Sequence, residues 1–178
     1  MKILVTHDPF LRLVAKPVLK LDKKLEKQIS EMISTLKASR DPEGVGLAAT
    51  QVGIDRRLFI VLLNGKPEIF INPVITKASE AMFSTVHTKK KDRWLEGCLS
   101  LPGIWGVVDR PYSIEMDYLT PENGELVKRH RKFEDAESAY VQHENDHLDG
   151  ILFTDHILRQ GGQILKDTKD GLTPIDQI

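Results

Sequence analysis

The first part of the chain carries apolar side chains at helical spacing. They follow Asp22 at intervals of three or four positions and are Leu25, Ile29, Met32, Ile33 and Leu36. A carboxylate at position 22 can accept a hydrogen bond from a free backbone N–H of the first turn. The pattern therefore predicts an amphipathic helix over residues 23–39, ended by Asp41-Pro42.

Two β-hairpins are predicted further along the chain. The runs RLFIVLL and EIFIN flank Asn64-Gly65, a dipeptide that favours the turn of a two-residue hairpin. Later, SIEMDYL and ELVKRHRKF alternate polar and apolar side chains on either side of the turn PENG. The segment GVGLAATQVG (44–53) is too rich in Gly and Ala for an independent strand and too apolar for a solvent loop. Residues 78–93 show no period and predict a long loop.

A second helix is predicted over about 135–149, with Asp135 as its N-cap and Gly150 ending it in a left-handed conformation. Glycines after this point limit any C-terminal helix, so residues 160–178 are expected to form a frayed tail. Because helices do not alternate with the strands, the order favours an α+β fold over a parallel βαβ sheet. At 178 residues the chain is expected to form a single domain, 1–178.

Composition narrows the class of protein. Lys+Arg 25 against Asp+Glu 26 gives a net charge of −1, and the run Lys89-Lys90-Lys91 is too short for a nucleic-acid stripe. No stretch approaches the roughly 20 apolar residues of a membrane helix, and Asp8-Pro9 comes too early for a secretory signal. One cysteine forms no intrachain disulfide, which suits a reducing compartment. We therefore expect a cytoplasmic protein that binds neither membrane nor nucleic acid.

The second predicted helix contains QHENDH, which matches HExxH. His143 and His147 lie four residues apart and so share one helix face, where both imidazoles can bind one metal ion. Glu144 lies about 100° around the helix and can reach a water on that ion without being a ligand. The chance of an accidental match in this composition is about 0.01. Two structural histidines are the alternative.

A catalytic metal site needs a third protein ligand. Residues 158–178 contain no Glu of the kind that a thermolysin-like protease would use. Upstream, Cys98 lies in EGCLS, and although a lone cysteine is usually a small buried hydrophobe, it would complete a Cys/His/His set. Such a set suits Fe²⁺, Ni²⁺, Co²⁺ or Zn²⁺ rather than Mg²⁺ or Ca²⁺.

The segments GVGLAATQ, EGCLS and QHENDH, in this order, resemble the three signature motifs of the peptide deformylases. That family removes the formyl group from the N-terminal methionine of nascent bacterial and organellar proteins. The segment from Asp8 to Val18 is similar too, so the resemblance runs from about residue 3 to 154. It implies antiparallel β-sheets packed around a central metal-binding helix, with an N-terminal amphipathic helix, and N-formylmethionyl nascent peptides as partners.

The resemblance also implies a set of site residues. The ligands of one divalent metal ion would be Cys98, His143 and His147. Glu144 would be the general acid/base, while the Gln51 amide and the Leu99 backbone N–H would donate to the oxyanion. Fe²⁺ is expected as the native ion, with Zn²⁺, Ni²⁺ or Co²⁺ as alternatives. The residues expected to bind substrate are Val45, Gly46, Gly97, Ala139 and Tyr140, of which Val45, Ala139 and Tyr140 would line the methionine pocket.

Other interpretations stay open at this point. Without the resemblance, Gln51 is equally a surface amide and Tyr140 equally a core residue. Glu96 is expected to pair with Arg110, and Asp146 either orients a ligand imidazole or faces solvent. The alternative functions are a zincin-type endopeptidase that uses HExxH and a non-catalytic, metal-stabilised binding protein. The host compartment could also be an organelle or a virus-infected cell.

Two features depart from the family pattern. The stretch between Asn72-Pro73 and Glu96 is longer than in compact bacterial members and would be a lid or a decoration. Some members carry a long basic C-terminal helix that docks on the ribosome, whereas Gly161-Gly162 interrupts this segment here. Ribosome contact by that route is therefore doubtful.

Overall fold

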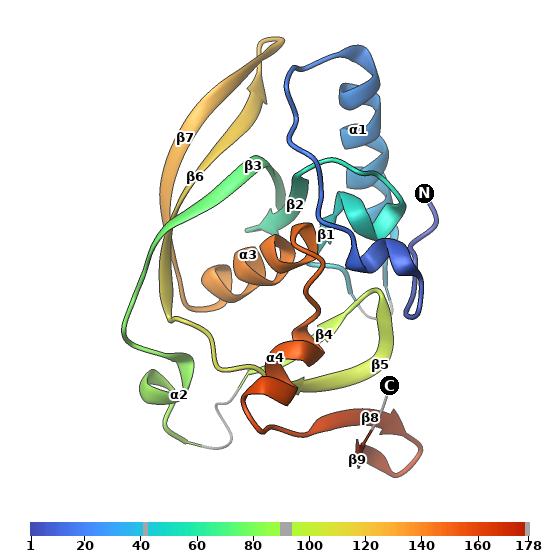
Figure 1. Ribbon diagram of the computed structural model, residues 1–178, viewed down its shortest axis with the longest axis vertical. Coiled ribbons are helices and arrows are strands. Elements are labelled where there is room, and N and C mark those ends of the chain that lie inside the picture. The colour runs from blue at the N-terminus through green and yellow to red at the C-terminus, as the bar shows by residue number, and fades with distance from the viewer. Residues whose placement is uncertain (41–42, 90–93, 177–178) are drawn as a thin grey trace.

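A single helix, α3 (Asp135–Leu148), lies at the centre of the computed structural model, which describes residues 1–40, 43–89 and 94–176 (Figure 1). An antiparallel sheet of five strands lies on one side of α3, and a second antiparallel sheet of four strands lies on the other. The first sheet has the order β1 (Gly46–Ala48), β2 (Leu58–Leu63), β3 (Lys66–Ala78), β6 (Ser113–Glu122) and β7 (Glu125–Glu134). The second has the order β4 (Leu95–Cys98), β5 (Leu101–Val107), β8 (Ile164–Thr168) and β9 (Gly171–Ile175). This arrangement confirms the α+β prediction.

Both predicted hairpins are present. β2 and β3 turn at Asn64-Gly65, whose φ angles of 51° and 74° are those that this tight turn requires. The other hairpin, β6–β7, turns at Asn123-Gly124. Strand β2 is buried on both faces because its alternate side chains belong to two different cores.

The first core lies between the five-stranded sheet and α3, where Phe59 of β2 belongs to the same cluster as Val141 of α3. The second lies on the opposite face of the sheet, under α1 (Lys23–Ala38). The predicted N-cap of α1 is confirmed, since Asp22 Oδ1 accepts a hydrogen bond from Leu25 N at 2.8 Å. The helix ends at Ala38, and the predicted break at Asp41-Pro42 lies outside the described residues.

The predicted N-cap of α3 is wrong, whereas the predicted left-handed glycine after its C-terminus is confirmed. Asp135 is not the N-cap: it is the first helical residue, with φ 51°, and its carboxylate contacts His87 Nε2 at 3.0 Å. At the other end Gly150 has the predicted left-handed conformation, with φ 67°. The segment around η1 (Pro9–Arg12) crosses this end, where Ala15 N donates to Leu148 O at 2.8 Å and Arg12 donates to Gly150 O at 3.3 Å.

Two segments for which the sequence predicted neither helix nor strand contain regular structure. The Gly/Ala-rich segment forms β1 and the buried 3₁₀ turn η2 (Ala49–Val52). The stretch expected to be one long loop contains α2 (Phe83–Val86), and Phe83 is buried beside Tyr112. Most of the lysine run lies outside the described residues, which omit 90–93.

The expectation of a frayed C-terminal tail is wrong. A short helix, α4 (Phe153–Arg159), is followed by the hairpin β8–β9, and β8 pairs with β5. Ile164 pairs with Gly106 and is 2% exposed, so this hairpin belongs to the second sheet and its core. Among the described residues, no helix combines the length and the apolar character needed to cross a membrane.

Candidate metal centre

The end of strand β4 faces the middle of helix α3, and this brings the three predicted ligands together. A register shift between Gly97 and Cys98 interrupts the β4–β5 pairing at this end. The Cys98 sulfur lies 3.2 Å from His147 Nε2, and the possible ligand atoms of Cys98, His143 and His147 all lie within 4.8 Å of one another. One ion can therefore contact all three side chains.

The electrostatics of the cluster fit a divalent cation. Burial alone would raise the pKa of the Cys98 thiol, but the His147 and His143 imidazoles outweigh burial and lower this pKa to about 5. The sulfur is thus readily available as the thiolate that a metal requires. Burial raises the pKa of Glu144 to about 7. Its Oε2 is buried and has no hydrogen-bond partner among the described residues, as expected if the partner is a ligand or water.

A buried carboxylate orients one of the two imidazoles. Glu96 Oε2 lies 2.9 Å from His143 Nδ1, which leaves Nε2 of that ring for a metal. Glu96 also forms the predicted pair with Arg110, through contacts of 2.5 and 3.0 Å. The contact of Glu96 with a ligand imidazole was not predicted, since no sequence spacing relates position 96 to position 143.

Asp146 matches neither of its two expected positions. It neither contacts a ligand imidazole nor faces solvent, because its Oδ2 accepts from Arg110 at 2.8 Å and lies 2.9 Å from His156 Nε2. Burial would raise the pKa of Asp146, but His156 and Arg110 outweigh burial and lower it. Asp146 therefore links Arg110 to His156 of α4.

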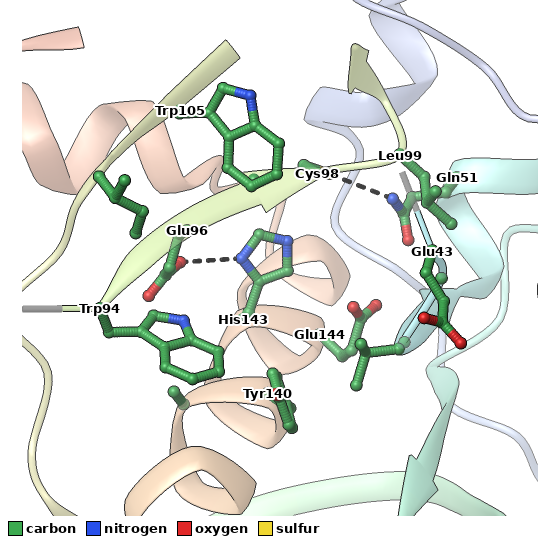
Figure 2. A pocket seen from close by; sticks show the side chains of 16 residues that line it. Glu43, Gln51, Trp94, Glu96, Cys98, Leu99, Trp105, Tyr140, His143 and Glu144 are labelled. Carbon is green, nitrogen blue, oxygen red and sulfur yellow. Dashed lines mark hydrogen bonds and ion pairs between the residues drawn. The ribbon is translucent and has the colours of Figure 1, made fainter. Parts of the chain in front are cut away.

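Gln51 lies inside the site, and the surface alternative is wrong. Its side chain is 1% exposed on η2, and its Nε2 lies 3.4 Å from the Cys98 sulfur and 3.1 Å from Ser100 Oγ. Its Oε1 accepts from Ala48 N at 2.8 Å, so the amide oxygen is engaged and the NH₂ group points toward the cluster. Leu99 lines the same cavity beside Gln51 (Figure 2).

A cavity of about 160 Å³ opens beside the ligands. Every residue expected to bind substrate lines it: Val45, Gly46, Gly97, Ala139 and Tyr140. Tyr140 also packs against the core of the larger sheet, so both of its predicted positions are occupied at once. The imidazole of His143 and the carboxylate of Glu144 face this cavity from α3 (Figure 2).

Two tryptophans in the cavity wall were missed. Trp105 pairs with Gly97 across β4 and β5, and a Cβ at position 97 would collide with its ring. Gly97 is therefore needed to admit this indole. Trp94 lies at the end of the cavity opposite Gln51, and its ring centroid is 5.4 Å from that of Tyr140 in an edge-on contact (Figure 2). Only the register of β4 against β5 could have indicated the first of these contacts.

Comparisons with known proteins agree with this geometry. The family model for polypeptide deformylase matches residues 1–162. A peptide deformylase of Natranaerobius thermophilus is 38% identical over 156 residues, which cover 86% of this chain and 90% of that protein. The crystal structure of peptide deformylase from Thermotoga maritima matches with a TM-score of 0.73 and 37% identity, over 87% of this chain and 95% of that one. An Arabidopsis thaliana peptide deformylase 1B in complex with an inhibitor matches with a TM-score of 0.76 and 32% identity, over 90% and 83% of the two chains.

Proposed function

The chain belongs to the polypeptide deformylase family, and from this premise we propose which of its residues carry out the reaction. It is an enzyme that hydrolyses the formyl amide of N-formylmethionyl peptides and releases formate. We assign the metal ligands to Cys98, His143 and His147. The observation that carries this assignment is the convergence of their ligand atoms within 4.8 Å, beside a Glu144 carboxylate whose buried Oε2 has no hydrogen-bond partner among the described residues.

The residues fit a divalent ion of intermediate softness, because a thiolate and two imidazoles are the donors that Fe²⁺, Zn²⁺, Ni²⁺ and Co²⁺ accept. When bound, such an ion lowers the pKa of a water ligand toward neutrality and polarises a carbonyl oxygen. We propose Fe²⁺ as the native ion. Glu96 contributes by holding the His143 ring through Nδ1.

Glu144 is the proposed general base and acid. Its raised pKa, about 7, allows it to accept a proton from the attacking water and to return that proton to the leaving amine near neutral pH. Its buried Oε2 is free of other hydrogen bonds within the described part of the chain, so neither proton transfer has to break one.

Gln51 and Leu99 are the proposed donors to the oxyanion that forms on the formyl group. The Gln51 amide is oriented by the hydrogen bond that its oxygen accepts from Ala48 N, so its NH₂ group needs little reorganisation during reaction. The backbone N–H of Leu99 is the second donor. By comparison with other oxyanion holes, one such donor contributes roughly 3 kcal/mol.

Membership of this family excludes the two alternative functions. The chain is not a zincin-type endopeptidase, because the family match covers residues 1–162 and includes the cysteine-containing segment as well as HExxH. It is likewise an enzyme and not a non-catalytic binding protein. We propose nascent N-formylmethionyl chains in a bacterial-type cytoplasm as its substrates. In the described part of the chain, Ile164–Thr168 and Gly171–Ile175 form a β-hairpin, where some family members have a basic helix.

The test is formate release from formyl-Met-Ala-Ser by anaerobically purified protein loaded with Fe²⁺ or Ni²⁺. The wild type should release formate, and Glu144→Gln should lower kcat by about 10²–10⁴-fold while its metal content, measured by elemental analysis, is unchanged. Cys98→Ser should lose the metal itself. Absence of formate from the loaded wild type, or equal release by Glu144→Gln, would contradict the assignment.

A further inference from the structure

A second cavity adjoins the first. This groove has a volume of about 900 Å³, several times that of the cavity beside the ligands. Three separate segments wall it: residues 82–87 around α2, residues 107–109 after β5, and residues 160–165 before and within β8. None of the metal ligands, nor Glu144 or Gln51, lines it.

Among the residues that the structure describes, Trp94 is the one that lines both cavities. It directly precedes β4, and its indole stands edge-on to Tyr140 with 67° between the ring planes. In Figure 2 these two rings lie together at one end of the ligand-side cavity, opposite Gln51 and Leu99. The indole of Trp94 therefore borders both cavities from one position.

The wall on the far side of Trp94 is anchored. Phe83 N donates to Arg110 O at 2.9 Å, and Ser84 contacts the Asp109 carboxylate through its backbone N–H at 2.9 Å and its hydroxyl at 2.6 Å. These bonds connect α2 to the segment that follows β5, so two of the groove's walls are joined to each other. Trp94 itself is 36% exposed, so its position depends on packing against Tyr140 more than on burial.

We propose that Trp94 is a specificity-determining residue: its indole closes the end of the methionine pocket and limits the length of the first side chain that the enzyme accepts. Methionine is unbranched and fills a short apolar pocket, whereas a longer chain would meet the indole. Removal of the indole would join the pocket to the groove. This inference rests on the proposed function, because it takes the first residue of a formyl peptide as the occupant.

The test uses formyl-X-Ala-Ser peptides in which X is norvaline, norleucine, 2-aminoheptanoate or 2-aminooctanoate, so that only length changes. In the wild type, kcat/KM should fall by about tenfold or more beyond norleucine, which has the length of methionine. In Trp94→Ala that fall should disappear, and the longest chain should become at least as good a substrate as norleucine. Trp94→Phe, which keeps a smaller ring, should give an intermediate profile.

Val107→Ala is the matched control, because Val107 lines the groove but not the ligand-side cavity and is 37% exposed. In Val107→Ala, kcat/KM should depend on the length of side chain X as it does in the wild type. Equilibrium binding of the same peptides to metal-loaded Glu144→Gln, with and without Trp94→Ala, gives a second readout that needs no turnover. If the wild type releases no formate, the proposed function fails and the binding profile still tests Trp94. The inference would be overturned if kcat/KM and binding affinity depended on side-chain length in the same way in the wild type and in Trp94→Ala.

Discussion

At the scale of single residues, Gly46 matters because of the atom that it lacks. Strand β1 passes so close to α3 that a Cβ at position 46 would collide with the carboxylate and the Cγ of Glu144. The side chain at position 144 is 5% exposed and faces the cavity, so a methyl group at position 46 would push its carboxylate out of place. A glycine at this strand position therefore fixes where the proposed general base stands.

We accordingly expect Gly46→Ala to displace the Glu144 carboxylate. Formate release should fall by about 100-fold or more, the lower range for loss of a general base, while metal content stays unchanged because none of the three ligands moves. Steady-state kinetics measure formate release, and elemental analysis of the same preparation measures the metal content. Activity within threefold of wild type would show that the strand yields and that Gly46 is not required.

At the scale of elements, the parts that sequence predicts well are those with local causes. Helix α1 has its period and its cap within 17 residues of sequence, and the β2–β3 hairpin has Asn64-Gly65 at its turn. The hairpin β8–β9 was missed because its strands are short and mostly exposed, and because β8 is held by pairing with the distant β5. Asp135 was mistaken for a cap because its carboxylate is engaged by His87, 48 residues away.

The same distinction applies to the site. Three motifs predicted one site for Cys98, Gln51 and the two histidines. The structure places Gln51, Cys98 and His143 in the wall of one cavity, with His147 in the ligand group beside it. Trp94 and Trp105 lie outside the three motifs. Trp105 is placed in the cavity wall by the register of β4 against β5, and Trp94 by its contact with the ring of Tyr140. Contacts of that kind are properties of the assembled fold, so spacing along the chain contains no signal for them.

The C-terminal hairpin gives a prediction at this scale. Ile164→Ala removes a buried side chain from the core that Phe153 and Ile157 also form, and should lower the free energy of unfolding by about 2–4 kcal/mol. Leu172→Ala, at a position on β9 that is 42% exposed, is the control and should change it by no more than about 0.5 kcal/mol. Urea denaturation of both variants compares them. Equal effects would mean that the hairpin is not part of the core.

At the scale of the whole molecule, an ion pair joins the N-terminal segment to α4. Arg12 contacts the Asp155 carboxylate, which also accepts from Leu152 N at 2.9 Å. Partial burial would raise the pKa of Asp155, but the hydrogen bonds from Arg12 and Leu152 outweigh burial and lower it. Because the folded state holds this carboxylate ionised more strongly than the unfolded chain does, the pair stabilises the fold above the unfolded pKa, about 4.

This stabilisation should be lost as the pH falls from about 4 through the lowered folded value. We expect Asp155→Asn to be less stable than wild type at pH 6, with a difference that shrinks toward pH 3. Urea unfolding across this range, in metal-free buffer with chelator, measures the difference. A gap between the two proteins that is constant with pH would show that the carboxylate charge is not responsible.

The crossing of the N-terminal segment over the end of α3 has a consequence for the synthesis of the protein. Arg12 and its partner Gly150 are 138 residues apart, so this contact must wait until residue 150 has been translated. The imidazole at position 147 is made 49 residues after the sulfur at position 98. An enzyme that acts on unfinished proteins thus completes its own metal centre only after residue 147 has been translated.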